Sequence, residues 1–152
     1  IIWDGHPGTM DRLAKRYEKY NPITIHGQTE VPKDENSSEY RKKLLDSFKQ
    51  KDEHKVLIAS YKVLSTAVNI TEANVNLYWS RSWDWSDFAQ SMKRTHRYGQ
   101  NETVYVRPFI MLGTLAILLD KNLKRKQKMN DEMFNADSLS KEQWKAIFEG
   151  NI

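Results

Sequence analysis

The chain has 152 residues, of which 39% are hydrophobic and 29% charged, which is typical of one globular domain with a substantial core. It contains no cysteine and no run of about 18 apolar residues, which excludes disulfides, thiolate metal sites and a membrane span. The net charge of +4 is a mild basic bias that is compatible with nucleic acid, and the four scattered histidines lack the spacing of a metal site, so no bound metal is expected.

The beginning of the chain predicts a strand that leads through a turn into a helix. Ile1 to Trp3 have the character of the end of a buried strand, and residues 4–8 form a turn cluster. Thr9 is expected to cap the following helix, whose apolar residues recur at the spacing of one helix face. The first residues lack the basic n-region of a signal peptide, so we expect a domain cut from a longer chain.

Strands and helices then alternate along the chain. Short apolar or β-branched runs predict strands, and apolar residues repeated every three or four positions predict helices. Pro108 marks the last strand as an edge strand. The alternation indicates an α/β fold with a mostly parallel sheet and helices on both of its faces. The further predicted strands are residues 23–25, 56–59, 76–79 and 103–110, and the further predicted helices lie around residues 40–48, at 85–97 and after Thr114.

The end of the chain carries a basic run and then a polar linker. For the cationic residues within 121–128, a solvated surface, a DNA-backbone contact and a contact to another lobe all remain open. Residues 130–137 predict a linker, and Ser140 with Gln143 forms a capping box before a final amphipathic helix. We therefore divide the chain into a domain of residues 1–129 and a C-terminal linker and helix, residues 130–152, that packs on the domain or extends it.

Ligand sites in folds of this kind lie beyond the carboxyl ends of the parallel strands. The predicted loops that leave strands at this edge are residues 5–8, 26–29, 60–71 and 79–85. We expect the functional site along this edge. The tryptophans of the last loop, which are Trp79, Trp83 and Trp85, are large and follow a strand, so we expect them mostly in the core. Stacking of one of them on a base or adenine is the alternative.

The segment from Gln90 to Gln100 is the most informative part of the chain. Gln90, Arg94 and Arg97 are four and three residues apart, so they share one face of a helix, which Gly99 then closes. A guanidinium is permanently charged and binds phosphate with a planar set of donors, so two of them suit the charge on a transferring phosphoryl group. The spacing alone is also typical of a solvated helix face. In a functional site, both guanidinium groups should project from the edge where the strands end.

This segment resembles motif VI of superfamily-two helicases, in the form found in the Swi/Snf branch of DNA translocases. Its residues that match the motif are Gln90, Arg94, His96, Arg97, Gly99 and Gln100. The resemblance extends over most of the chain. Residues 1–17 are similar to motif IV, His26-Gly27 with residues 41–48 to the block that follows it, and residues 56–74 to motif V.

The resemblance implies the second, C-terminal RecA-like lobe of a Swi/Snf-type DNA-dependent ATPase, with a three-layer α/β/α architecture. Motif V departs from the family pattern, because Leu64, Ser65 and Ala67 stand where the family has glycines. Glycine allows backbone shapes and close approaches that leucine does not. Since both arginines are retained, a divergent working enzyme is favoured over an inactive one.

Residue roles follow from the resemblance at the matching positions. Arg94 and Arg97 are expected to be the catalytic pair that neutralises charge on the phosphoryl group. Ordinary strand exits, turns and caps are the alternative for some of the other matches. The expected nucleotide contacts are Gln90, Gly99, Gln100 and Asn69, and the expected contacts to the DNA backbone are His26, Gly27, Gln28, Thr29, Ser60, Lys62 and Thr71.

ATP and Mg²⁺ are the cofactors that the resemblance implies for the complete two-lobe protein. This sequence has neither a phosphate-binding loop with its lysine nor an Asp-Glu pair at the end of a strand. In the family both belong to the first RecA-like lobe, so that lobe and double-stranded DNA are the expected partners. The chain alone is expected to be an inactive monomer that binds no cofactor.

Two other functions stay open at this point. The chain could be a non-catalytic module that binds nucleic acid or protein on the same fold, or a lobe of a superfamily-two RNA helicase. Its richness in lysine and asparagine hints at an AT-rich bacterial or viral genome and hence at a cytoplasmic location, whereas a eukaryotic relative would be nuclear.

Overall fold

The computed structural model describes residues 1–50, 53–65 and 69–135. The chain divides into two compact units, Ile1–Met111 and Leu112–Ile152, which are described separately. The capping box and final helix predicted for residues 140–150 lie outside the described residues. Among the helices in the described ranges, none is long and apolar enough to cross a membrane.

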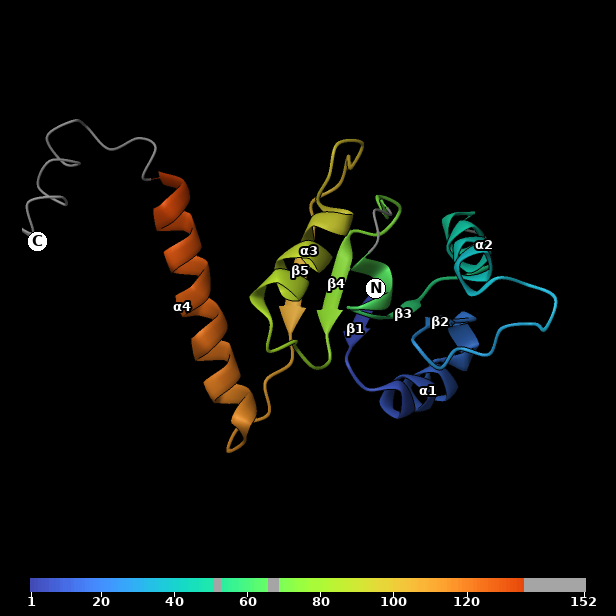
Figure 1. The fold of residues 1–152 in the computed structure, drawn as a ribbon, viewed down its shortest axis with the longest axis horizontal. Coiled ribbons are helices and arrows are strands. Elements are labelled where there is room, and N and C mark those ends of the chain that lie inside the picture. The colour runs from blue at the N-terminus through green and yellow to red at the C-terminus, as the bar shows by residue number, and fades with distance from the viewer. Residues whose placement is uncertain (51–52, 66–68, 136–152) are drawn as a thin grey trace, which may run out of the picture. The chain divides into compact units, whose positions relative to one another are not determined.

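The first unit is built on a five-stranded sheet. The strands lie in the order β2-β3-β1-β4-β5, which Figure 1 shows, and every pair of neighbours is parallel. The predicted α/β fold with a parallel sheet is therefore confirmed, and β5 is an edge strand that ends in proline, as predicted. The strands are β1 (Ile2–Asp4), β2 (Ile23–Ile25), β3 (Leu57–Ser60), β4 (Val75–Tyr78) and β5 (Tyr105–Pro108).

Helices cover both faces of this sheet. α1 (Pro7–Arg16) packs on one face, and α2 (Ser37–Lys49) and α3 (Trp85–Thr95) pack on the other. Alternate residues along a strand point to opposite faces, so β1, β3 and β4 contribute to both cores. The unit has the predicted three layers. The α1 side buries Ile2, Met10, Leu13 and Ile58, and the opposite side includes Trp3, Leu45, Phe48, Tyr78 and Phe88.

α1 begins earlier than the sequence predicts. His6 is its N-cap and Pro7 its first residue, a position that suits proline because the first backbone N–H of a helix has no intrahelical acceptor. Thr9 therefore lies inside the first turn, where its hydroxyl accepts a hydrogen bond from Arg12 at 3.3 Å. The prediction that Thr9 caps this helix is wrong.

α3 ends at Thr95, two residues before its predicted end. His96 leaves helical geometry with a ψ of 80°, and the Gln100 N–H donates to the Arg97 carbonyl at 3.0 Å, which closes a turn. Gly99 has a φ of 97° within this turn, a conformation that favours glycine. The prediction that the helix reaches Arg97 and is closed by Gly99 is therefore wrong, because Gly99 shapes the turn that follows the helix.

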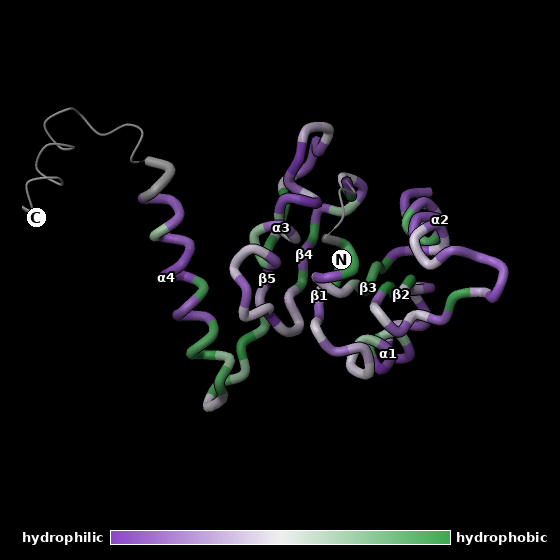
Figure 2. The backbone as a smooth tube through the Cα atoms, in the orientation of Figure 1, coloured by the Kyte–Doolittle hydropathy of each residue, from purple (hydrophilic) through white to green (hydrophobic). Residues whose placement is uncertain are grey.

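The described part of the second unit is the long helix α4 (Leu115–Asn135). Thr114 begins it as predicted, since its Oγ1 accepts from the Ala116 N–H at 3.2 Å. Figure 2 shows hydrophobic first turns and a more hydrophilic continuation. Ion pairs at the i, i+4 spacing (Lys124–Asp120 and Lys128–Glu132) support the helix through the polar stretch. The linker was predicted for residues 130–137, of which the described residues 130–135 are helical instead, and the boundary proposed after residue 129 lies within α4.

Two of the three tryptophans that follow β4 lie at the surface. Trp79 is 42% exposed and Trp83 59% exposed, whereas Trp85 packs against the core. The Trp79 ring contacts Phe109, itself half exposed at the end of the edge strand β5, with 5.4 Å between the ring centroids. The core prediction is thus wrong for Trp79 and Trp83, because they leave the sheet beside its edge strand.

Candidate functional site

α3 is a capped helix whose last turn is cationic. Asp84 is its N-cap, and the Asp84 Oδ1 accepts from the Ser86 N–H at 2.8 Å. Asp87 lies in the first turn, and Lys93 and Arg94 lie in the last. Acidic residues at the start and basic residues at the end both complement the helix dipole. The local sequence therefore concentrates positive charge at the C-terminal end of α3.

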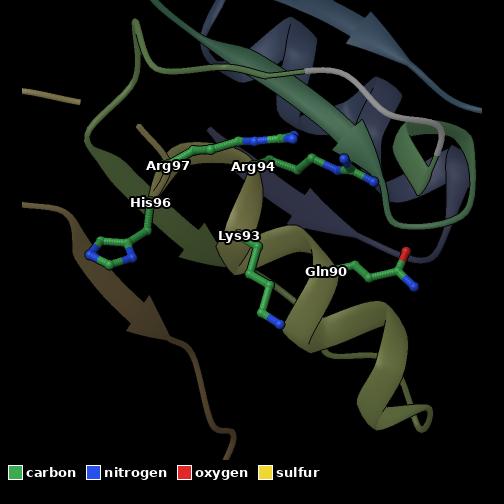
Figure 3. Close-up of a pocket in the computed structure, with 5 residues that line it drawn as sticks. All are labelled: Gln90, Lys93, Arg94, His96 and Arg97. Carbon is green, nitrogen blue, oxygen red and sulfur yellow. The ribbon is translucent and has the colours of Figure 1, made fainter. Parts of the chain in front are cut away.

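A groove of about 520 Å³ lies at this end of the helix. In Figure 3, Arg94 and Arg97 extend to one side, together with Gln90 from the middle of α3, while His96 points to the other side. The structure thus brings Gln90, Arg94 and Arg97 to one site, although Arg97 comes from the turn after the helix. The lining residues are Gln90, Lys93, Arg94, His96 and Arg97.

Positive charge dominates the groove, since none of its five lining residues is acidic. Partial burial of Arg94, and then the positive charge of Arg97, lower the pKa of the Arg94 guanidinium. A guanidinium stays protonated in proteins even so, and the two like charges repel each other. A bound anion would relieve that repulsion, so the arrangement suits a ligand with phosphate groups.

The segment before β4 is bonded to the arginine turn. Arg97 Nη1 donates to Asn69 Oδ1, and the Ile70 N–H donates to the Arg94 carbonyl at 2.9 Å. Asn69, a predicted nucleotide contact, therefore orients the Arg97 side chain in this structure.

Both arginines lie at the edge of the sheet opposite to the predicted one. α3 runs antiparallel to β4, because Thr95 bonds to Asn76 near the start of β4 and Ser91 bonds to Tyr78 at its end. The prediction that the guanidinium groups project where the strands end is wrong, since a crossover helix returns to the edge where the next strand begins. Arg97 is nevertheless exposed and Arg94 is half-buried, so neither is locked in the interior.

The Gln100 side chain binds the main chain of its own lobe. Its Nε2 lies 3.0 Å from the Thr71 carbonyl oxygen and 3.1 Å from that of Ala73. Its Oε1 accepts from the Glu102 N–H at 3.0 Å. Both ends of this amide, a predicted nucleotide contact, are therefore engaged within the fold.

The two remaining predicted nucleotide contacts are solvent-exposed. Gln90 Nε2 donates to Ser86 Oγ at 3.1 Å on the surface of α3, one turn before Arg94. Gly99 lies in the exposed turn beyond Arg97, and a Cβ added there would meet no atom within 4 Å. Of the two, Gln90 lines the groove and Gly99 does not.

The loop after β2, predicted to contact DNA, is closed on itself. His26 is only 5% exposed, its Nδ1 accepts from the Gln28 N–H at 3.1 Å, and its Nε2 lies 3.0 Å from Asp11 Oδ1. Because Nδ1 accepts, the ring proton is on Nε2 and is donated to Asp11. Thr29 Oγ1 accepts from the His26 N–H at 2.8 Å. The His26 ring thus holds the loop, and the exposed residues are Gly27 and Gln28.

The other residues predicted to contact DNA divide between the two edges of the sheet. Ile25 pairs with Ala59, so His26 and Ser60 leave neighbouring strands side by side, and the exposed Lys62 follows. Thr71 instead precedes β4, and its carbonyl is bound by Gln100 near the arginine turn. The structure therefore groups the loop of residues 26–29 with Ser60 and Lys62, and separates Thr71 from them.

A second hollow, of about 420 Å³, contains basic residues that the sequence did not single out as ligands. The Arg41 Nε is buried and has no hydrogen-bond partner among the described residues. Arg41 begins the block of residues 41–48 that resembles the family pattern, but it was not predicted as a ligand, and Lys42 follows the ordinary polar pattern of an amphipathic helix. Leu64, at a motif V glycine position, is 3% exposed and packs in the core. The hollow is lined by Ser38, Glu39, Arg41, Lys42, Leu45, Lys62, Val63 and Leu64.

Lys93 and His96 line the arginine groove without having been predicted as ligands. The signal for Lys93 was present, because a second basic side chain beside Arg94 in the last turn of a helix adds to the same charge. Within the part of the chain that the structure describes, no three His, Asp or Glu side chains are grouped to hold a metal ion. The groove therefore has the chemistry of an anion site.

Comparison with known proteins gives a consistent picture. Residues 6–99 match the family described as "Helicase conserved C-terminal domain". A Drosophila melanogaster protein, SWI/SNF-related matrix-associated actin-dependent regulator of chromatin subfamily A-like protein 1, is 30% identical over 131 residues, which cover 85% of this chain and 16% of that protein. The Schizosaccharomyces pombe DNA repair protein rad8 is 33% identical over 90 residues, which cover 59% of this chain and 8% of that protein.

Among solved structures, the C-terminal part of the Fun30 ATPase domain is similar to this chain, with a TM-score of 0.68. The sequence identity is 21%, and the match covers 80% of this chain and 38% of the other. At this identity the similarity concerns the fold alone, and it confirms the RecA-like α/β architecture. The chain spans only a small part of the curated relatives that it matches.

Proposed function

The chain belongs to the helicase conserved C-terminal domain family, in its SWI/SNF-related branch, and from this premise we propose that it is the second lobe of a two-lobe ATPase that moves along duplex DNA. In this proposal the groove at the end of α3 faces the phosphates of ATP bound by the first lobe. The loops after β2 and β3 contact the DNA backbone.

The observation that carries the proposal is the composition of the groove. Lys93, Arg94 and Arg97 converge on one open surface from a single helix end, without an acidic residue among the five that line it. Like charges that cluster on a protein surface repel each other and destabilise the folded state, unless a bound anion offsets them. The donors fit phosphate oxygens, and the same donors do not fit Mg²⁺, which prefers carboxylate, carbonyl and water oxygens.

Arg94 and Arg97 would act by electrostatic stabilisation. ATP supplies the phosphoryl group that is transferred to water, and negative charge spreads over its oxygens during transfer. The two guanidinium groups cannot exchange protons near neutral pH, so their contribution is to offset that charge through preorganised hydrogen-bond donors. The Asn69–Arg97 and Ile70–Arg94 bonds support this preorganisation.

DNA would bind at the opposite edge of the sheet. The exposed residues Gly27 and Gln28 lie in the loop after β2, beside the Ser60 end of β3, and Lys62 lines the basic hollow with Arg41. Backbone amides, amide side chains and cations are the groups that bind phosphates without reading sequence. This edge therefore suits a contact that must be remade at every step along DNA.

One segment connects the two proposed sites. The described residues 60–65 follow the end of β3, and residues 69–71, which precede β4, include Asn69 and Ile70, whose polar groups contact the arginine turn. Closure of two lobes around ATP and their opening after hydrolysis is a common way to couple a nucleotide site to a second ligand. In this chain the segment from Ser60 to Thr71 would transmit that coupling.

The test uses the complete two-lobe protein with Arg94→Ala and Arg97→Ala. We expect each change to lower DNA-stimulated ATP hydrolysis on the order of a thousandfold, because charge on the phosphoryl group loses one of its two cations. The measurement is phosphate release at saturating DNA, with circular dichroism to verify folding.

Arg107→Ala is the matched control for these variants. Arg107 is an exposed arginine on β5 whose Nη1 donates to the neighbouring Val106 carbonyl at 3.3 Å and whose guanidinium lies over the Tyr105 ring at 5.7 Å. Its removal takes away the same charge from a different place and should leave turnover unchanged. Near-normal turnover in both groove variants would remove the catalytic assignment.

A further inference from the structure

Buried hydrogen bonds, together with the partly buried Met92, hold the last turn of α3 on the sheet. The buried residues of the helix are Phe88, Ser91 and Thr95, so the two toward its C-terminal end are hydroxyl residues. Phe88 packs on the Tyr78 ring in the first half of the helix, with 4.8 Å between the ring centroids. Apolar contact is non-directional, whereas a hydrogen bond constrains both distance and angle. The end that carries the arginines is therefore the end with the more specific attachment.

The last turn is attached by a buried chain of hydrogen bonds in which each side chain donates to the next member. Trp3 Nε1 donates to Asn76 Oδ1 at 2.9 Å, Asn76 Nδ2 donates to Thr95 Oγ1 at 2.6 Å, and Thr95 Oγ1 donates to the Met92 carbonyl at 3.3 Å. The side chains of Trp3, Asn76 and Thr95 are 0% exposed. Water cannot replace a missing partner in such a place, so the chain holds only when every member is present.

Asn76 is an unusual residue for its position. It lies in β4, a strand of a parallel sheet, on the face that also carries the buried ring of Tyr78. An amide buried there costs free energy unless both of its ends are hydrogen-bonded, and an apolar residue would fill the same space without that cost. Its presence therefore provides something other than core volume, namely a fixed distance between β4 and Thr95.

Thr95 is directly connected to the catalytic pair. It follows Arg94 and precedes Arg97 by two residues, and it is the last residue of the helix. The Thr95 carbonyl accepts from Gln100 Nε2 at 3.4 Å, and the Arg94 carbonyl accepts from the Ile70 N–H. A displacement of the Thr95 side chain would therefore move the whole turn that presents both guanidinium groups.

We propose that Asn76 and Thr95 are positioning residues that set the placement of Arg94 and Arg97 for phosphoryl transfer. The inference rests on the proposed function of the groove. Because these residues affect the geometry of the arginines, their substitution should lower the rate of turnover and leave the binding of ATP and DNA almost unchanged.

The experiment uses the complete two-lobe protein with Thr95→Val, which removes the hydroxyl and keeps the shape. A misplacement of about 1 Å can lower a rate by about a hundredfold, so we expect kcat to fall between about tenfold and a hundredfold. The KM for ATP and the Kd for DNA should change by less than about twofold, as when an interaction is made only in the transition state. Thr95→Ser, which keeps the hydroxyl, should restore most of the turnover. Asn76→Leu should reproduce the effect where it folds.

The same helix and strand provide the matched control. Tyr78 hydroxyl and Ser91 Oγ are 3.0 Å apart, one turn farther from the arginines. Tyr78→Phe removes this buried bond between α3 and β4 without touching the last turn, so it should lower stability and keep kcat. Equal losses of turnover in Tyr78→Phe and Thr95→Val would show a general packing role and overturn the inference.

A double variant separates this inference from the proposed function. In the Arg97→Ala background, Thr95→Val should have a much smaller effect on kcat, because residues that act as a unit are non-additive. If Arg97→Ala collapses turnover while Thr95→Val does not, the positioning role fails and the arginine assignment stands. If neither arginine variant affects turnover, the proposed function itself fails.

Discussion

Tyr61 and Tyr78 are buried phenols that stack beside Trp3 at the centre of the sheet. Burial raises the pKa of Tyr61, with smaller additions from Tyr78 and Asp4. Burial also raises the pKa of Tyr78, and the hydrogen bond with Ser91 partly opposes it. The folded chain therefore keeps both phenols protonated at a pH where the unfolded chain ionises them.

The first prediction concerns stability at high pH. Unfolded tyrosines ionise near pH 10, so above about that value the unfolded state binds fewer protons than the folded state and the free energy of unfolding falls as pH rises. Below about pH 10 the tyrosines are protonated in both states, so the free energy of unfolding does not change with pH on their account. Urea unfolding between about pH 8 and pH 11 should show the fall, and Tyr61→Phe with Tyr78→Phe should reduce its slope. Tyr98→Phe, at a side chain that is 102% exposed, should leave the slope unchanged. An unaltered slope in the double variant would contradict the assignment.

Single side chains also show why motif matching does not assign a role by itself. His26 and Gln100 match family positions, yet His26 bonds to Asp11 and to the Gln28 N–H, and Gln100 bonds to carbonyl groups that precede β4. Sequence spacing cannot tell a side chain that binds a ligand from one that holds the loop presenting it, because both require the same polar groups at the same place.

At the scale of helices, the caps explain where α2 and α3 begin. Asn36 Oδ1 accepts from the Ser38 N–H and Asp84 Oδ1 from the Ser86 N–H, both at 2.8 Å. Each bond satisfies one of the backbone donors that a helix start leaves unpaired. α1 has no side-chain cap and starts at Pro7.

Substitution of the caps tests this difference. Asn36→Ala and Asp84→Ala should each lower the free energy of unfolding by about 1 kcal/mol, since each leaves a helix N–H without its acceptor. Thr9→Ala should change it by less than about 0.5 kcal/mol, because Thr9 lies within α1 and caps nothing. Urea unfolding of the isolated variants measures all three. If Thr9→Ala lowered the free energy of unfolding as much as Asp84→Ala does, the result would support the predicted cap at Thr9.

The helix boundaries that the sequence missed have local physical causes. Proline at the first position moved the start of α1, a glycine with positive φ shaped a turn where the sequence suggested more of α3, and i, i+4 ion pairs extended α4 through a polar stretch. Each is a competition between local hydrogen-bonding patterns at one end of a helix. Apolar periodicity, which predicted the existence of these helices, does not decide such competitions.

For the whole molecule, strand alternation was sufficient to predict the parallel sheet, its layers and its edge strand. The placement of the arginines was not predictable in the same way, because the rule that ligands lie beyond the carboxyl ends of parallel strands concerns ligands held by the sheet's own loops. The groove lies at the end of a crossover helix, and a ligand there needs a second body to enclose it. Three of the five residues that line the groove, Gln90, Arg94 and Arg97, were among the predicted site residues, whereas the edge on which they lie was predicted wrongly.

This incompleteness gives a prediction for the chain by itself. It should release no phosphate from ATP above the rate in buffer, since the sequence has no phosphate-binding loop with its lysine and no Asp-Glu pair after a strand. The complete two-lobe protein should show hydrolysis that DNA stimulates. Both are measured by phosphate release, with circular dichroism to establish that the isolated chain is folded. Turnover by the isolated chain that Arg97→Ala abolishes would contradict the two-lobe arrangement.

The edges of the sheet have a consequence for how the chain meets other proteins. β2 has three residues, and β5 has four and ends in Pro108 next to the exposed Arg107. A short strand, a proline that lacks a donor and an outward charge each discourage another chain from adding a strand through backbone pairing. Self-association through these two sheet edges into fibres or swapped dimers is thereby disfavoured.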